Sequence, residues 1–139
     1  MEQEDYIKRQ IDQLGRVLGK ILDGLMGLRA RGRVSQGIES VSQDLKTELD
    51  LNLEDLALIP TESFLNTLLE TKKFSDNSFE QLAEIMYLIA GELNDKNKDV
   101  SKMKQLYERA LIIFEILDKT SSTYSFDRHS KIEIIKKML

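Results

Sequence analysis

The side chains that could carry catalysis are few in this chain of 139 residues, which has no cysteine and a single histidine, His129. Without cysteine there is no thiol nucleophile, no zinc–thiolate site and no disulfide. A serine-type triad would depend on His129, yet no Gly-x-Ser-x-Gly sequence supplies a nucleophile for it. We therefore expect His129 to be structural. The sequence predicts a protein that is not an enzyme and uses no cofactor.

Two segments superficially resemble ligand-binding loops. Residues 95–99 place oxygen ligands at positions 1, 3 and 5 of a calcium-loop pattern, but Val100 and Leu106 stand where it needs glycine and glutamate. Residues 15–20 have three residues between their glycines instead of the four of a phosphate loop, and no serine or threonine follows the lysine. We expect neither a metal nor a phosphate site.

Carboxylates and tyrosines offer a third kind of chemistry. Glu80 and Glu84 are four residues apart on an expected helix, but a metal site in a helical bundle would also need Glu-x-x-His repeats, which the chain lacks. Glu84, Tyr87 and Tyr107 could instead line a helical cleft that binds a small ligand or acts as an enzyme. This alternative function requires a concave pocket where polar groups converge.

The distribution of charge bears on nucleic-acid binding. Arg29, Arg31 and Arg33 form a short basic cluster, with Arg16 and Lys20 on the preceding helix. No aromatic residues are interleaved with these cations, as they are in many surfaces that bind nucleic acid. The net charge of the chain is −4, and most of the acidic excess lies between residues 36 and 70. We expect no nucleic-acid partner.

The clearest pattern in the chain belongs to its first helix, expected from about Tyr6 to Arg29. Apolar residues recur there at alternating spacings of four and three. These seam residues are Ile7, Ile11, Leu14, Leu18, Ile21, Leu25 and Leu28. A heptad seam of this length requires a partner helix, either in the same chain or in another molecule. Gly15 and Gly19 leave a notch where a second helix could approach closely, or else they mark an irregular helix.

The seam leads to the main functional hypothesis, a protein–protein interaction module that associates through its first helix with itself or with another protein. It predicts that Leu18→Glu breaks an oligomer without unfolding the later helices. The same helix could alternatively lie on a membrane surface, because Arg16 and Lys20 stand opposite its apolar side. The segment 14–28 has no aromatic residue to anchor it at such an interface.

The rest of the chain also favours helix, because it is rich in Leu, Ile, Glu, Lys and Gln and has one proline, Pro60. We expect an all-α fold of five to six helices. After the first, the expected helices are 36–49, one that Thr61 caps, 79–93 with Asn77 or Ser78 as the cap, 100–117 with Asp99 as the cap, and a last helix that Ser125 caps. The helix 79–93 has a wide apolar stripe and should lie at the centre of the fold. Asn52 should cap a short turn over residues 53–58.

These helices suggest an antiparallel helical array. The amphipathic segment 1–34 and the helical segment 35–139 are expected to form a single compact domain. No apolar run reaches the ~18 residues that a membrane-spanning helix needs. The first residues, Glu2, Glu4 and Asp5, are acidic where a secretory signal is basic. We therefore expect a cytoplasmic protein.

Two stretches carry a resemblance to known proteins. The segment 5–14, together with Tyr107-Glu108-Arg109-Ala110-Leu111 and the following Phe114, resembles a family of small bacterial helical proteins of unknown function. Residues 79–139 resemble a tetratricopeptide-type helix pair with a further helix, although no proline follows the second helix and the connecting loop is long. The resemblance implies a bacterial origin and a repeat-like helical domain, and it implies no activity.

Overall fold

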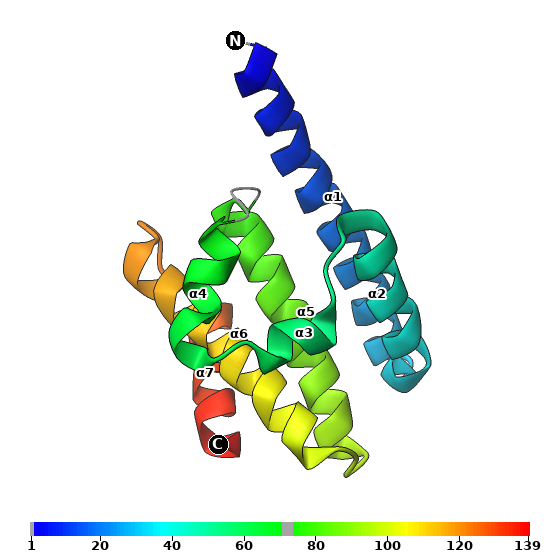
Figure 1. Ribbon diagram of the computed structural model, residues 1–139. Helices are drawn as coiled ribbons and strands as arrows, with labels where there is room; N and C mark the ends of the chain where they lie inside the picture. The colour runs from blue at the N-terminus through cyan, green and yellow to red at the C-terminus, as the bar shows by residue number, and fades with distance from the viewer. Residues whose placement is uncertain (1, 71–73) are drawn as a thin grey trace.

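The computed structural model describes residues 2–70 and 74–139, and this part of the chain contains seven α-helices and no β-strand (Figure 1). The helices are α1 (Glu2–Ala30), α2 (Val34–Leu49), α3 (Leu53–Leu58), α4 (Thr61–Glu70), α5 (Asp76–Asp95), α6 (Val100–Thr120) and α7 (Phe126–Met138). The all-α prediction is confirmed. The number of helices exceeds the expected five to six because the segment 53–58 forms a short helix instead of a turn.

The antiparallel pair α5–α6 forms the centre of the fold. α1 and α2 pack on α5, whereas α3, α4 and α7 pack on α6 (Figure 1). The two central helices supply much of the core, whose fully buried members include Leu82, Ile85, Met86, Ile89, Leu106, Ala110 and Phe114. The wide apolar stripe predicted for α5 is explained by this position, because neighbours cover it on more than one side.

Local capping signals position several helix starts. Asp99 and Ser125 each accept a hydrogen bond from the backbone amide three residues later, at 3.1 Å in both cases. Asn52 accepts bonds from two backbone amides at the start of α3. These three predicted caps are confirmed, and each satisfies backbone donors that a helix start leaves without intrahelical partners.

Other boundaries differ from the sequence predictions. α5 is capped by Ser75, whose hydroxyl accepts a hydrogen bond from the amide of Ser78 at 3.1 Å, and not by Asn77 or Ser78. The reason is that Ser75 is the extended residue before the helix, whereas Ser78 is already helical and buried. Similarly, Thr61 is the first residue of α4 and not its cap.

α1 is the longest helix, with 29 residues. It runs antiparallel to α2, and its N-terminal turns extend beyond the rest of the described structure (Figure 1). Despite this length it is not a membrane span, and none of the helices in the described ranges combines the length and apolar character that crossing a bilayer requires.

Candidate functional site

The structure places the middle of the predicted seam inside the protein. Leu14, Leu18, Ile21 and Leu25 are buried, and Leu18 has an exposed fraction of 0%. The covering helices are α2 and α5 of the same chain. Towards the C-terminal end of the seam, Leu28 is partly buried and packs against the core. The partner helix that the heptad pattern requires is therefore present within the molecule over this part of α1.

The two glycines beside the seam, Gly15 and Gly19, face α5. A Cβ atom added at Gly15 would lie 3.5 Å from Oγ of Ser78, and one added at Gly19 would lie 3.0 Å from Nε2 of Gln81. The second distance is tighter than ordinary van der Waals contact. The small residues thus permit a close approach between α1 and α5.

The burial of Leu18 changes what a substitution there would do. A glutamate at this position would put a carboxylate among apolar side chains with no positive partner provided for it, which costs several kcal/mol. Because α5 itself packs on this face of α1, we now expect Leu18→Glu to disturb the later helices as well, contrary to the prediction from the sequence. Variants that probe association must lie elsewhere on α1.

The N-terminal end of α1 remains accessible. Ile11 is only partly buried, and Tyr6 has an exposed fraction of 62%. The side chain of Ile7, the first seam residue, lies outside the described residues. The segment also divides by charge, because acidic residues at positions 2–5 precede Lys8 and Arg9. The N-terminal end of α1 therefore presents one exposed aromatic ring beside two turns of opposite charge.

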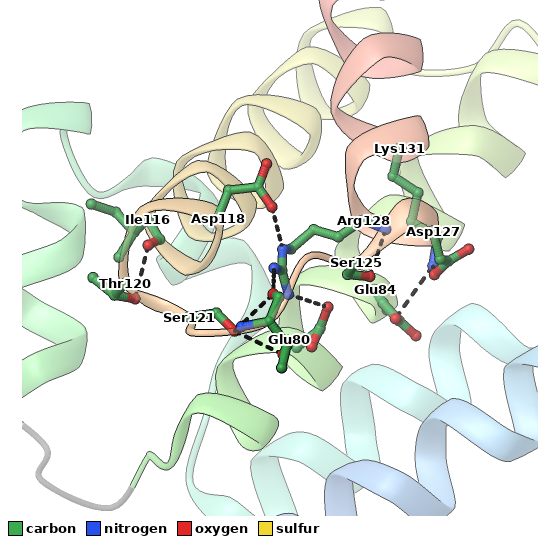
Figure 2. A network of polar contacts seen from close by, with 11 residues as sticks. Glu80, Glu84, Ile116, Asp118, Thr120, Ser121, Ser125, Asp127, Arg128 and Lys131 are labelled. Carbon is green, nitrogen blue, oxygen red and sulfur yellow. Dashed lines mark hydrogen bonds and ion pairs between the residues drawn. The ribbon is translucent and has the colours of Figure 1, made fainter.

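A buried arginine fastens α7 to the central pair of helices. The side chain of Arg128 is 5% exposed, and its Nε donates a hydrogen bond to Asp118 at 2.8 Å (Figure 2). Its Nη1 donates to Glu80 at 3.2 Å. One guanidinium therefore joins α7 to α6 and α5, with both hydrogen bonds reinforced by charge.

One turn further along α7, Lys131 makes a second connection to α5. Its Nζ lies 3.3 Å from Glu84 and 2.8 Å from Asp127 (Figure 2). The same Nζ lies 5.7 Å from the centre of the Tyr87 ring. Burial raises the pKa of Glu84 above its ordinary value, against the lowering effect of Lys131. Burial lowers the pKa of Lys131, but the hydrogen bond to Asp127 and the charge of Glu84 outweigh it and raise that pKa. Glu84 of α5 is therefore paired with Lys131 of α7.

A cleft of about 200 Å³ opens beside this ion pair, between the ends of α1 and α5 and the helices α6 and α7. Tyr87 and Tyr107 both line it, with their rings edge to face and their centres 6.0 Å apart. Of the three residues that the sequence suggested for a ligand cleft, the structure therefore brings together the two tyrosines. Glu84 is not among the residues that line the cleft.

Tyr107 is the most buried of the polar residues that line the cleft. The residue is 3% exposed, and its hydroxyl oxygen would lie 3.6 Å from a Cβ atom added at Gly91. It forms no hydrogen bond with any described residue. Burial, helped by Tyr87 and Asp95, raises the pKa of Tyr107 to about 12. The phenol is therefore protonated at neutral pH and able to donate a hydrogen bond.

Sequence reasoning missed three charged residues of the cleft, Arg29, Glu92 and Asp95. They lie at the C-terminal ends of α1 and α5, and they come together only because these two helices pack side by side. The sequence offers no signal for this, since each residue has a local explanation at a helix end or in a polar loop. Comparisons with family models, with curated proteins and with solved structures find no significant match.

Proposed function

We propose that this protein is a non-catalytic interaction module that associates with a second copy of itself through the N-terminal end of α1. The observation that carries the proposal is that only part of the seam is covered by other helices of the same chain. Its middle is covered by α2 and α5, whereas its first turns extend beyond both helices and expose Tyr6 (Figure 1). A helix that continues its apolar pattern past its own domain can pack against another helix there.

Charge favours a second copy as the partner. The acidic residues Glu4 and Asp5 precede the basic residues Lys8 and Arg9 by one helical turn. In an antiparallel pair of α1 segments related by a twofold axis, the acidic turn of each copy would face the basic turn of the other. Such complementary charges around an apolar contact select the orientation of the two helices.

The body of the protein would then support α1. We propose that α5, α6 and α7 form a tetratricopeptide-like antiparallel array, with α5 and α6 of 20 and 21 residues. Both are longer than the helices of a repeat of about 34 residues, which is a departure from that pattern. The resemblance to a small bacterial helical family and the cytoplasmic location also remain predictions.

Membrane binding is less well supported than self-association. An interfacial helix must offer its apolar side to lipid, but the side of α1 that carries Leu14, Leu18 and Leu25 packs inside the protein. Only the exposed N-terminal turns could reach a lipid surface, and their acidic residues would be repelled by anionic headgroups.

The test is a charge exchange, read by light scattering after size exclusion over a range of protein concentrations. One variant carries Lys8→Glu with Arg9→Glu, and the other carries Glu4→Lys with Asp5→Lys. We expect the unmodified protein to be dimeric, each variant alone to be mostly monomeric, and a mixture of the two to form a heterodimer. The matched control is Lys136→Glu with Lys137→Glu, which reverses two exposed charges on α7 and should leave the dimer intact. An unmodified chain that is monomeric at every concentration would refute the proposal.

A further inference from the structure

The helices α3 and α4 together form a strap, residues 53–70, that lies along one side of α6 (Figure 1). Within the described ranges, α6 is the only helix on which either of them packs extensively. The two helices have 6 and 10 residues, and isolated helices of such lengths are unstable in water. The strap therefore depends on α6 for its structure, whereas α6 is also packed against α5 and α7.

The apolar attachment of the strap is small. Among its described side chains, the buried ones are Leu53, Leu56, Ala57 and Phe64, whereas Leu58 is exposed. The stabilisation from burial grows with the apolar area that is removed from water. Four residues supply much less of it than the nine buried residues of α5. Removing the strap from α6 should therefore cost far less free energy than separating the central helices.

The polar attachments of the strap are also few. Oε1 of Glu54 lies 3.5 Å from Nζ of Lys102, but the glutamate is largely exposed, and an ion pair so open to water contributes little. The stronger attachment is Arg109 of α6, which donates a hydrogen bond from Nη2 to the carbonyl oxygen of Ile59. The guanidinium of Arg109 also lies 5.8 Å from the centre of the Phe64 ring.

The same arginine makes the closed strap costly. Arg109 is buried, and its Nε has no hydrogen-bond partner among the described residues. Its ion pair with Glu108 joins two neighbouring residues of α6, so this pair does not hold the strap. A buried guanidinium that is only partly hydrogen-bonded costs free energy. Water would satisfy Nε once the strap had left, so the burial of Arg109 offsets part of the apolar gain.

We propose that the strap is a conformational device that opens as one unit, while α6 stays packed between α5 and α7. Its two helices open together because only Ile59 and Pro60 separate them and Arg109 contacts both Ile59 and Phe64. Opening uncovers Arg109 and the side of α6 around it. Proteins open locally in such units at free energies below that of global unfolding. The strap does not include α1, so its opening and the proposed dimer can be refuted separately.

The experiment is amide hydrogen exchange of the full chain at low concentrations of urea. We expect the protected amides of α3 and α4 to share one opening free energy and to exchange about 100-fold or more faster than the slowest amides of α5. Their exchange should also depend less steeply on urea, because opening the strap exposes less surface than global unfolding. Amides of α3 and α4 that exchange as slowly as those of α5 would refute the proposal.

A substitution in α5 separates local opening from global unfolding. Ile89 is fully buried, and it stays packed when only the strap opens. Ile89→Val should therefore speed the slowest amides of α5 about fivefold and leave the exchange of α3 and α4 unchanged. Equal acceleration in all three helices would mean that the strap unfolds only with the rest of the chain, and the proposal would be wrong.

A matched pair of substitutions in α3 tests whether the strap opens as one unit. Leu56→Val and Leu58→Val change helix propensity alike, but Leu56 is buried and Leu58 is exposed. Leu56→Val should speed exchange about fivefold more than Leu58→Val does, in α4 as well as in α3. An effect that is confined to α3, or is the same for both variants, would contradict a cooperative strap.

Discussion

Arg128 offers the sharpest test of how the C-terminal helix is held. We consider Arg128→Met, which keeps a long unbranched side chain and removes the charge and all the donors. The substitution eliminates the bonds to Asp118 at 2.8 Å and to Glu80 at 3.2 Å. Hydrogen bonds to charged groups contribute about 1.5–3 kcal/mol each to stability.

Two effects reduce the sum of these contributions. Removing the guanidinium also removes the cost of burying it. The carboxylates of Asp118 and Glu80 have side-chain exposures of 28% and 29%, so water can partly replace the lost donors. We therefore expect Arg128→Met to lower the free energy of unfolding by about 2–3 kcal/mol. For a chain of this size the melting temperature should fall by about 4 °C per kcal/mol.

The measurement is urea denaturation followed by circular dichroism, with Lys136→Met as a control at an exposed position of α7 that should change stability by less than about 0.5 kcal/mol. A double-mutant cycle with Asp118→Asn should give a coupling energy of about 1–2 kcal/mol. Amide hydrogen exchange in α7 would reveal a loss confined to that helix. A destabilisation below about 1 kcal/mol without faster exchange in α7, or a coupling energy of zero, would refute this account of the network.

Three further predictions follow from burial and backbone space. Leu18→Ala should cost about 3–5 kcal/mol in urea denaturation because it opens a cavity at a fully buried site, and a loss below about 1 kcal/mol would place the seam outside the core. Gly24→Ala, in open space on a helix, should raise stability by about 0.5–1 kcal/mol in the same assay, whereas Gly37→Ala should lose that gain because its methyl group meets Leu28. The pKa of Tyr107 is raised from 10 to about 12, so its folded form holds its proton longer than the unfolded form and stability should fall as the pH rises through that window. Tyr107→Phe should make this alkaline loss smaller in thermal melts, and an unchanged pH dependence would contradict the assignment.

Signals that act within one helical turn could be predicted from the sequence. Asp99, Ser125 and Asn52 cap the helices that they were expected to cap, because each precedes a strong apolar pattern and its side chain needs only a nearby amide. The start of α5 was missed because several serine, asparagine and aspartate residues occur in succession from Ser75. Each is a good cap, and only the backbone conformation selects among them.

Tertiary pairings could not be predicted in the same way. The heptad seam correctly indicates that α1 needs a partner helix, but a periodic pattern does not identify which helix supplies it. The same limit applies to charges. The sequence suggests Glu84 as a residue of a cleft because its ion-pair partner, Lys131, lies far along the chain. Arg29 and Asp95 have ordinary local explanations at helix ends, so the sequence does not indicate that they line the cleft.

The packing of α1 on α5 also has a consequence for how the protein is made. Synthesis proceeds from the N-terminus, so the ribosome completes α1 and α2 well before α5 has been translated. During that interval α2 alone can shelter the leucines of the seam, and the face destined for α5 stays open to water and to other nascent chains. Contacts between neighbouring segments form faster than contacts between distant ones. The α5–α6 pair should therefore form as soon as both helices leave the ribosome, and the α1–α2 pair should then pack on α5. A chain stalled between α2 and α5 would therefore be the species that most needs a chaperone.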